Sequence, residues 1–233
     1  DLPPRVRRQR QMCIRDSGII VGSHILQIND IKEERFNPMG VSDAELAELH
    51  TKKFAVMDDA VGEKMQERIL QAKSELNSVG GVIEAIALHL PAGIGAPYFD
   101  SVESMLSHAL FSVPAVKGVE FGDGFGFARL TGAEANDALH YVDGKVKALT
   151  NHNGGVTGGI TNGMPFVVRV AIKPTPSIAR EQQTVSLKEQ ADTTLAIVGR
   201  HDPCIVQRAV PVIEAVVAWT LWDLLLEAKK WEK

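Results

Sequence analysis

Apolar residues recur along the chain with two different spacings, one typical of strands and one typical of helices. The strand-like segments are rich in β-branched and other apolar side chains and are bounded by glycine, proline or polar residues. These segments are residues 18–31, 82–90, 115–121 and 166–172. They alternate with helical segments, but without the regular strand–helix–strand order of a parallel sheet. We therefore predict an α+β fold in which antiparallel sheets pack against helices.

Helical segments are predicted from start signals and from apolar residues spaced three or four apart. The predicted starts are Ser42, Asp100 and Thr131, each followed three positions later by a glutamate. Residues 61–76 carry an apolar stripe of helical spacing that stops before a pair of glycines. The chain closes with a helix predicted from about residue 211 to residue 230, and its opening proline is tolerated in a first turn.

The composition is that of an ordinary globular protein, with 45% hydrophobic and 23% charged residues among 233. The net charge of −4 is uneven, because residues 1–17 carry +3 and residues 18–233 carry −7. An acidic body without a basic stripe argues against nucleic acid as a partner. The two cysteines give no disulfide framework, which suits a reducing cytoplasm. The most apolar stretch, residues 210–226, is interrupted by proline and charged residues and predicts a buried helix, with no membrane span.

Residues 1–17 differ from the rest of the chain. They contain five arginines and two prolines, and the run RRQRQMCIRDS at 7–17 resembles the translation of a sequencing-library adaptor in one reading frame. A natural basic tail is the alternative. We expect residues 1–17 to be a non-native leader without a fixed place in the fold, because they offer no apolar face to bury.

A glycine-dense segment at 153–163 is the first of three irregular segments that a packed core does not require. Its five glycines let the backbone approach an anion or a flat ring closely. Tight turns between strands explain the same glycines equally well. Neither nucleotide-binding glycine pattern occurs here. His152, just before this segment, is a candidate for lining a site.

The second segment, Lys-Pro-Thr-Pro-Ser at 173–177, directly follows a predicted strand. Two prolines make it rigid and extended, and it offers one cation and two hydroxyl donors to a phosphate group. A proline-braced surface loop is the alternative.

The third segment, Gly-Arg-His-Asp-Pro-Cys at 199–204, places a cation, an imidazole, a carboxylate and a thiol before a buried helix. His201 and Cys204 could form half of a zinc site, but no second ligand pair follows at a suitable spacing. A lone cysteine is more often a small buried apolar residue than a nucleophile. Asp202, oriented by Arg200, is the better candidate for acid–base chemistry.

These segments occur together, and in this order, in chorismate synthases, which the chain resembles through nearly all of residues 18–230. The resemblance is carried by SHILQI, PAGIGAPYFD, SVPAVKGVEFGDGF, NHNGGVTGGITNGMPF, KPTPSI and GRHDPCIVQRAVPVIEA. It implies a truncated β-α-β sandwich and a homotetramer. It also implies a shikimate-pathway lyase that converts 5-enolpyruvylshikimate 3-phosphate into chorismate and phosphate by a 1,4-anti elimination. Reduced FMN is the implied cofactor, and the resemblance also associates the chain with NADP.

The resemblance assigns flavin-binding roles to two segments, one glycine and one arginine. The segments border the flavin and hold its phosphate end, the glycine packs near it, and the arginine reaches the region between flavin and substrate. These residues are Pro114, Ala115, Gly158, Lys173, Pro174, Thr175, Pro176, Ser177 and Arg200. By the same resemblance, Asp202 lies near flavin N5 and is suited to moving a proton, and Arg200 shares the catalytic region.

The chain departs from the family at its beginning. The family's N-terminal portion, with two acid–base histidines and an arginine cluster for the substrate phosphate, has no counterpart in residues 1–17. We therefore expect residues 18–233 to be the C-terminal portion of a single chorismate synthase domain. A catalytically silent fragment that binds flavin or phosphate is the alternative function.

Overall fold

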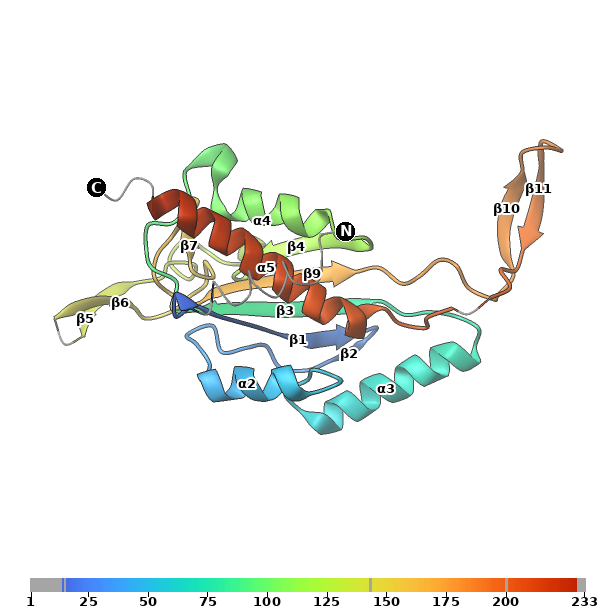
Figure 1. Cartoon of the computed structure of the whole chain (residues 1–233), viewed down its shortest axis with the longest axis horizontal. Helices are drawn as coiled ribbons and strands as arrows, with labels where there is room; N and C mark the ends of the chain where they lie inside the picture. The colour runs from blue at the N-terminus through green and yellow to red at the C-terminus, as the bar shows by residue number, and fades with distance from the viewer. Residues whose placement is uncertain (1–13, 15, 143, 200, 230–233) are drawn as a thin grey trace.

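A five-stranded antiparallel sheet forms the centre of the fold (Figure 1). The computed structural model describes residues 14, 16–142, 144–199 and 201–229. The strands lie in the order β2-β1-β3-β9-β4, and each neighbouring pair is antiparallel. Their bounds are β1 Ile20–Ile28, β2 Ile31–Lys32, β3 Gly81–Leu88, β4 Val116–Phe121 and β9 Phe166–Ile172. The α+β class with antiparallel sheets is confirmed.

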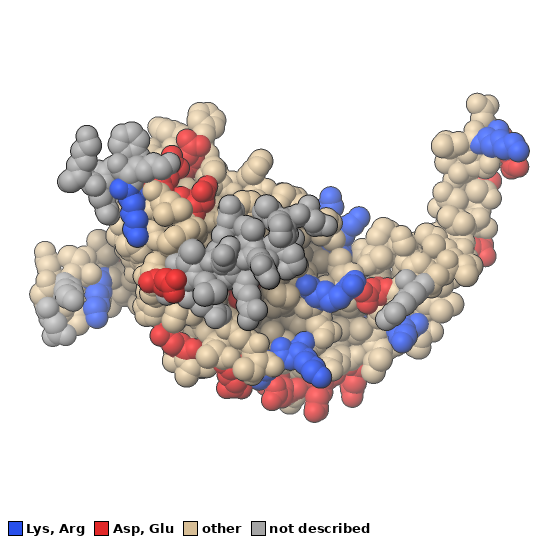
Figure 2. All heavy atoms as spheres, in the orientation of Figure 1, with Lys and Arg blue, Asp and Glu red and all other residues tan. Residues whose placement is uncertain are grey.

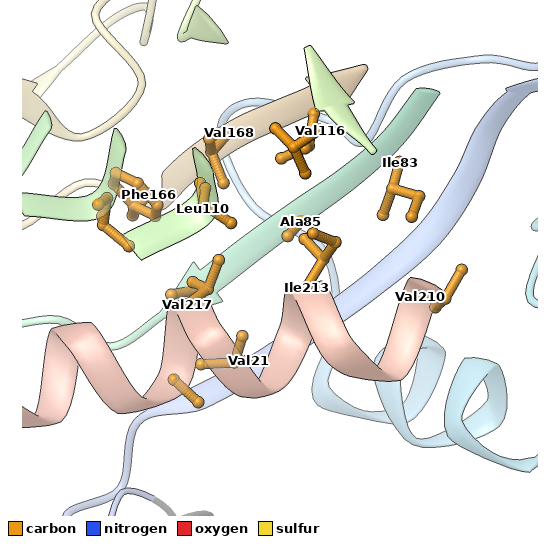
Figure 3. Packing of buried hydrophobic residues seen from close by; sticks show 14 of the residues in the cluster. Val21, Ile83, Ala85, Leu110, Val116, Phe166, Val168, Val210, Ile213 and Val217 are labelled. Atoms are coloured by element: carbon orange, nitrogen blue, oxygen red, sulfur yellow. The ribbon is translucent and has the colours of Figure 1, made fainter. Parts of the chain in front are cut away.

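Two helices cover one face of this sheet. Helix α4, Val102–Phe111, packs on β4, and the long helix α5, Val206–Lys229, packs on β1 and β3. Figure 3 shows Ile213 and Val217 of α5 directed toward sheet residues such as Ala85. Helices α2, Asp43–Thr51, and α3, Asp59–Ser74, lie along the β1 side of the sheet. Figure 2 shows acidic side chains along the lower edge, over these two helices.

Three further two-stranded sheets complete the described structure. Two of them are hairpins that extend away from the body at opposite ends (Figure 1). They are formed by β5 Leu139–Val142 with β6 Lys145–Ala148, and by β10 Gln182–Ser186 with β11 Ala191–Leu195. The third, β7 Val156–Thr157 with β8 Ile160–Thr161, lies inside the glycine-dense segment. Two short 3₁₀ turns, η1 Tyr98–Asp100 and η2 Gly124–Arg129, flank α4 and β4.

Several predicted boundaries are wrong, each for a local reason. The strand predicted at 18–31 is a hairpin, because Asn29 adopts a left-handed φ of 52° and turns the chain. The helix predicted at Thr131 is only a single turn. The reciprocal hydrogen bonds between Thr131 and Glu134 close this turn, but no apolar face follows that would stabilise a longer helix. Leu76 has a φ of 55° and lies beyond α3, exposed to solvent.

Helix α5 begins five residues earlier than predicted, so that Pro211 lies inside it. Val206 and Val210 are buried and extend the apolar face to the new start, which stabilises the additional turn. By length and composition alone, α5 is also long and apolar enough to cross a membrane, a test that core helices pass as well. Ten of its residues are buried, including Ile213 and Leu221 against the sheet, and this packing identifies it as a core helix.

The outer face of α5 carries apolar side chains at seven-residue spacing. Val212, Trp219 and Leu226 are each more than 40% exposed along this face. The opposite face of α5 packs on the five-stranded sheet. Among the residues that the structure describes, no second sheet of similar size covers the outer face.

The expectation that residues 1–17 have no place in the fold is wrong at Ile14. This side chain is 2% exposed and belongs to the main core cluster. The backbone amide of Ser17 donates to the Ile14 carbonyl at 3.2 Å and closes a turn before β1. Ile14 lies only six residues before β1, so its side chain can reach the apolar core beside that strand, and its removal from water favours this position. Residues 1–13 and 15 lie outside the described residues.

Candidate functional site

Two of the predicted flavin segments meet at one end of the sheet. Strand β4 begins directly after Ala115, and its Val116 pairs with Ile172, the last residue of β9. The Lys173 amide then donates to the Ala115 carbonyl at 2.9 Å. Ala115 has a φ of 75°, which is uncommon for a non-glycine residue. Such strained residues concentrate at binding sites, so Pro114–Ala115 and Lys173 are reasonable parts of one site.

The Lys-Pro-Thr-Pro-Ser segment extends from this junction as an irregular strap. The Lys173 side chain is exposed, and it forms no ion pair with the residues that the structure describes. Thr175 and Ser177 are partly buried beside it. Ser78 donates from its hydroxyl to the Thr175 carbonyl at 2.6 Å and fixes the middle of the strap. An uncompensated cation with two nearby hydroxyls fits the phosphate end of a flavin mononucleotide.

The 199–204 segment lies close to this strap, and it is hydrogen-bonded to the backbone of the residues that follow α3. The Pro203 carbonyl accepts from the Val79 amide at 2.8 Å. A cavity of about 280 Å³ opens here, lined in part by Ile178 of the strap side and His201 of this segment. His201 donates from Nε2 to the Ile197 carbonyl at 3.0 Å. Arg200 lies outside the described residues.

Asp202 forms an ion pair with Arg208, in the first turn of α5, and its side chain is 41% exposed. A carboxylate in this position is accessible to a ligand. Cys204 is buried, and burial raises the pKa of its thiol. A buried thiol with a raised pKa is a poor nucleophile.

Gly158 lies away from this junction. It forms the turn between β7 and β8, next to the start of α4, where the Val102 amide donates to the Gly159 carbonyl at 3.0 Å. Strand β9, about 20 Å long at the usual rise of a strand, separates this turn from Lys173. The sheet therefore places Gly158 at its opposite end.

The glycines of the 153–163 segment differ in whether a β-carbon would fit at their positions. A β-carbon at Gly154, Gly155 or Gly159 would lie 2.5–2.7 Å from neighbouring backbone or side-chain atoms. Those glycines serve tight packing, as the turn interpretation predicts. A β-carbon at Gly158 would meet nothing within 4 Å, although its φ is 62°. Gly158 thus leaves open space beside the backbone where a ligand could approach.

A row of charges across the sheet, buried except for the partly exposed Glu120, is the feature that the sequence patterns did not reveal. It runs from His24 on β1 through Glu84 on β3 and Arg169 on β9 to Glu120 on β4. His24 Nε2 lies 3.1 Å from Glu84, and Arg169 donates to Glu84 at 3.1 Å and to Glu120 at 2.5 Å. Glu33 closes the row at His24 Nδ1. The sequence signal that could have revealed this row is a charged or titratable residue in the middle of each of four largely apolar strands.

The surroundings of His24 and Glu84 favour the ionised form of each of these two side chains. Burial lowers the pKa of the His24 imidazole, but Glu33 and Glu84 outweigh burial, and the pKa ends above its ordinary value of 6.5. Burial raises the pKa of Glu84, but hydrogen bonds from His24, the Phe36 amide and Arg169 lower it below its ordinary value. The row is therefore a compensated set of buried charges.

We expect the melting temperature to depend on the charge of His24. Because its pKa is raised in the folded state, its stabilisation is complete below the ordinary histidine pKa of about 6.5 and is lost as the pH rises through the folded value. Thermal unfolding of the full chain between about pH 6 and pH 9 should show this loss. The loss should shrink in His24→Gln and persist in His108→Gln, which changes an exposed histidine of α4. If the melting temperature of His24→Gln fell with pH as much as that of the unchanged chain, deprotonation of His24 would not be its cause.

His152 forms a second carboxylate–histidine contact at the base of the β5–β6 hairpin. Its Nδ1 lies 2.6 Å from Asp123, and its amide donates to Asp137 at 2.7 Å. Asp137 also accepts from the amide and side chain of Asn153. These contacts fix the entry to the glycine-dense segment. They place His152 on the Gly158 side of the sheet, away from Asp202.

Comparison with known proteins points to one family. The family model described as chorismate synthase matches residues 10–226. The chain is 50% identical over 175 residues to the chorismate synthase of Thermococcus gammatolerans, covering 75% of this chain and 49% of that protein. It is 42% identical over 211 residues to the enzyme of Methanosarcina barkeri, covering 91% and 57%. It is 43% identical over 218 residues to that of Synechococcus sp., covering 93% and 59%.

A solved structure is also similar. A crystal structure of chorismate synthase superposes with a TM-score of 0.76 at 29% identity, covering 95% of this chain and 61% of that one. The chain spans about half the length of the curated relatives it matches. The family match includes residues 10–17, part of the segment that the sequence analysis set apart. From residue 10 to residue 226, the chain belongs to the chorismate synthase family.

Proposed function

We propose that this chain is the C-terminal, flavin-holding part of an enzyme that converts 5-enolpyruvylshikimate 3-phosphate into chorismate and phosphate. The observation that carries the proposal is the meeting of Ala115, Lys173 and the Asp202 segment at one end of the sheet of a chorismate synthase family member. The reaction is a 1,4-anti elimination. It places the enzyme in the shikimate pathway, and we assign the chain to the cytoplasm.

Reduced FMN is the proposed cofactor, and it would lend electron density to the substrate as phosphate leaves. Lys173, Thr175 and Ser177 would bind its phosphate end through one cation and two hydroxyls. Pro114 and Ala115, which adjoin Lys173, would border the ring system. The exposed ammonium of Lys173, without an ion pair among described residues, is what an incoming anion requires.

Asp202 would move a proton beside the flavin, and Arg200 would bind an anionic group there. Asp202 is the accessible carboxylate of this region, and Arg208 holds its orientation. A positioned carboxylate can transfer a proton only when its geometry is fixed relative to the reacting atom. The ion pair with Arg208 supports that requirement.

The proposal includes a division of the enzyme. Residues 18–233 would form the C-terminal portion of one domain, and the relatives' residues outside the match would supply the histidines and arginines that the sequence lacks. The exposed apolar face of α5 would then be covered by that missing part. Apolar side chains on the projecting β10–β11 hairpin, such as Val185 and Leu195, would be buried between subunits of a homotetramer.

We expect the purified chain to form no chorismate from 5-enolpyruvylshikimate 3-phosphate and reduced FMN under anaerobic conditions. The leaving phosphate would lack its arginine contacts and the reaction would lack two acid–base groups, and each such loss costs about 10²-fold or more. Chorismate absorbance is the measurement, with the Thermococcus gammatolerans enzyme as the active control. Turnover by the chain at a rate near that of the control would contradict the proposed division. FMN binding without turnover would be consistent with the alternative function, a catalytically silent fragment that binds flavin.

A further inference from the structure

The turn between α3 and β3, residues 77–80, lies between the two segments of the candidate flavin site. From one side of this turn the Ser78 hydroxyl donates to the Thr175 carbonyl at 2.6 Å, in the middle of the strap. From the next residue the Val79 amide donates to the Pro203 carbonyl at 2.8 Å, beside Asp202. The turn is therefore hydrogen-bonded to both segments through neighbouring residues.

The turn itself is held tightly. Leu76 enters it with a left-handed φ of 55°, and the Asn77 amide donates back to the Ala72 carbonyl of α3 at 2.8 Å. A β-carbon at Gly80 would lie 2.4 Å from the Ile172 carbonyl oxygen and 2.9 Å from the Pro174 nitrogen. Only glycine allows the turn to approach the end of β9 so closely.

The strap depends on hydrogen bonds from outside, because its own residues offer few backbone donors. Pro174 and Pro176 have no amide hydrogen, so these two residues cannot donate backbone hydrogen bonds. The Lys173 amide bonds Ala115 at the start of the strap. Ser78 provides the bond at its centre.

We propose that Ser78 is a positioning residue that fixes the phosphate-binding strap relative to the Asp202 segment. This inference rests on the proposed function, because it assigns the strap and Asp202 to the same flavin. A misplacement of about 1 Å between groups that act on one ligand is enough to weaken binding or rate severely. The α3–β3 turn opposes such a displacement, because one side chain and one backbone amide of neighbouring residues hold the two segments.

The test compares Ser78→Ala and Ser78→Thr in the full chain with Ser74→Ala. Ser74 is the matched control, because its hydroxyl donates to the Gln71 carbonyl at 2.7 Å on the exposed end of α3. Two readouts are measured for each protein. NMR hydrogen exchange follows the amides of Val79 and Lys173, and fluorescence titration with oxidised FMN gives the dissociation constant.

Ser78→Ala should speed exchange of both amides and raise the FMN dissociation constant about fivefold, the scale of one lost hydrogen bond. Ser78→Thr, which keeps the hydroxyl, should restore both, and Ser74→Ala should change neither. Unchanged exchange in Ser78→Ala would overturn the proposal, and so would faster exchange with unchanged FMN affinity. If no protein binds FMN, wild type included, the proposed function fails, and exchange alone decides whether Ser78 joins the two segments.

Discussion

Replacing Arg169 by methionine is expected to lower the free energy of unfolding by about 3–5 kcal/mol, the usual cost of removing one partner from a buried ion pair. The Arg169 side chain is 4% exposed on β9 and donates to Glu84, Glu120 and the Gly122 carbonyl. Methionine keeps the length of the side chain but removes the guanidinium partner of the fully buried Glu84 and leaves His24 as its remaining charged contact. Urea unfolding followed by circular dichroism gives the measurement.

Arg208→Met is the matched control for this substitution. Its guanidinium pairs with Asp202 on the surface, where the side chain is 72% exposed. Exposed ion pairs contribute only about 0.2–1 kcal/mol. Equal losses in the two variants would show that the row of buried charges does not stabilise the sheet as described.

Asp202→Asn is expected to reduce turnover by about 10²-fold or more in an enzyme that joins this chain to the N-terminal part of a relative. We call this protein the restored enzyme: residues 18–233 of this chain joined to the part of the Thermococcus gammatolerans enzyme that precedes the matched region. Asparagine keeps the size of the side chain and most of its hydrogen bonding but cannot exchange a proton. FMN and substrate should therefore still bind, and the effect should appear in kcat.

The alternative role for Asp202 is structural. Helix α5 begins at Val206, and the ion pair with Arg208 would account for a modest contribution to stability. Asp192→Asn, on the exposed strand β11, controls for the loss of one surface carboxylate. A melting curve and stopped-flow turnover separate the roles. Near-normal turnover with a lowered melting temperature would remove Asp202 from the proposed chemistry.

The sequence predicted those parts of the molecule that depend on neighbouring residues. The central strands, the α2 capping box and the irregular strap at 173–177 are local patterns, and the structure contains each of them. The α2 capping box in particular keeps both of its reciprocal bonds between Ser42 and Glu45. Resemblance to a family then assigned the strap and Asp202 to one site.

Features that depend on pairing between distant strands could not be predicted from the sequence in this way. Glu84 and Arg169 are 85 positions apart, and only the register of β3 with β9 places them opposite one another. The bond from Ser78 to Thr175 spans 97 positions. Burial of Ile14 required knowing which core surface remains uncovered beside β1. Propensity and periodicity contain none of this information.

The central claim is that this chain supplies the flavin-holding half of a chorismate synthase, and chorismate formation by the restored enzyme tests it most directly. The assay uses 5-enolpyruvylshikimate 3-phosphate and reduced FMN without oxygen and follows chorismate absorbance. We predict turnover within about tenfold of the intact Thermococcus gammatolerans enzyme, a barrier difference of about 1.4 kcal/mol. A restored enzyme that is folded and tetrameric, binds FMN and forms no chorismate would contradict the claim.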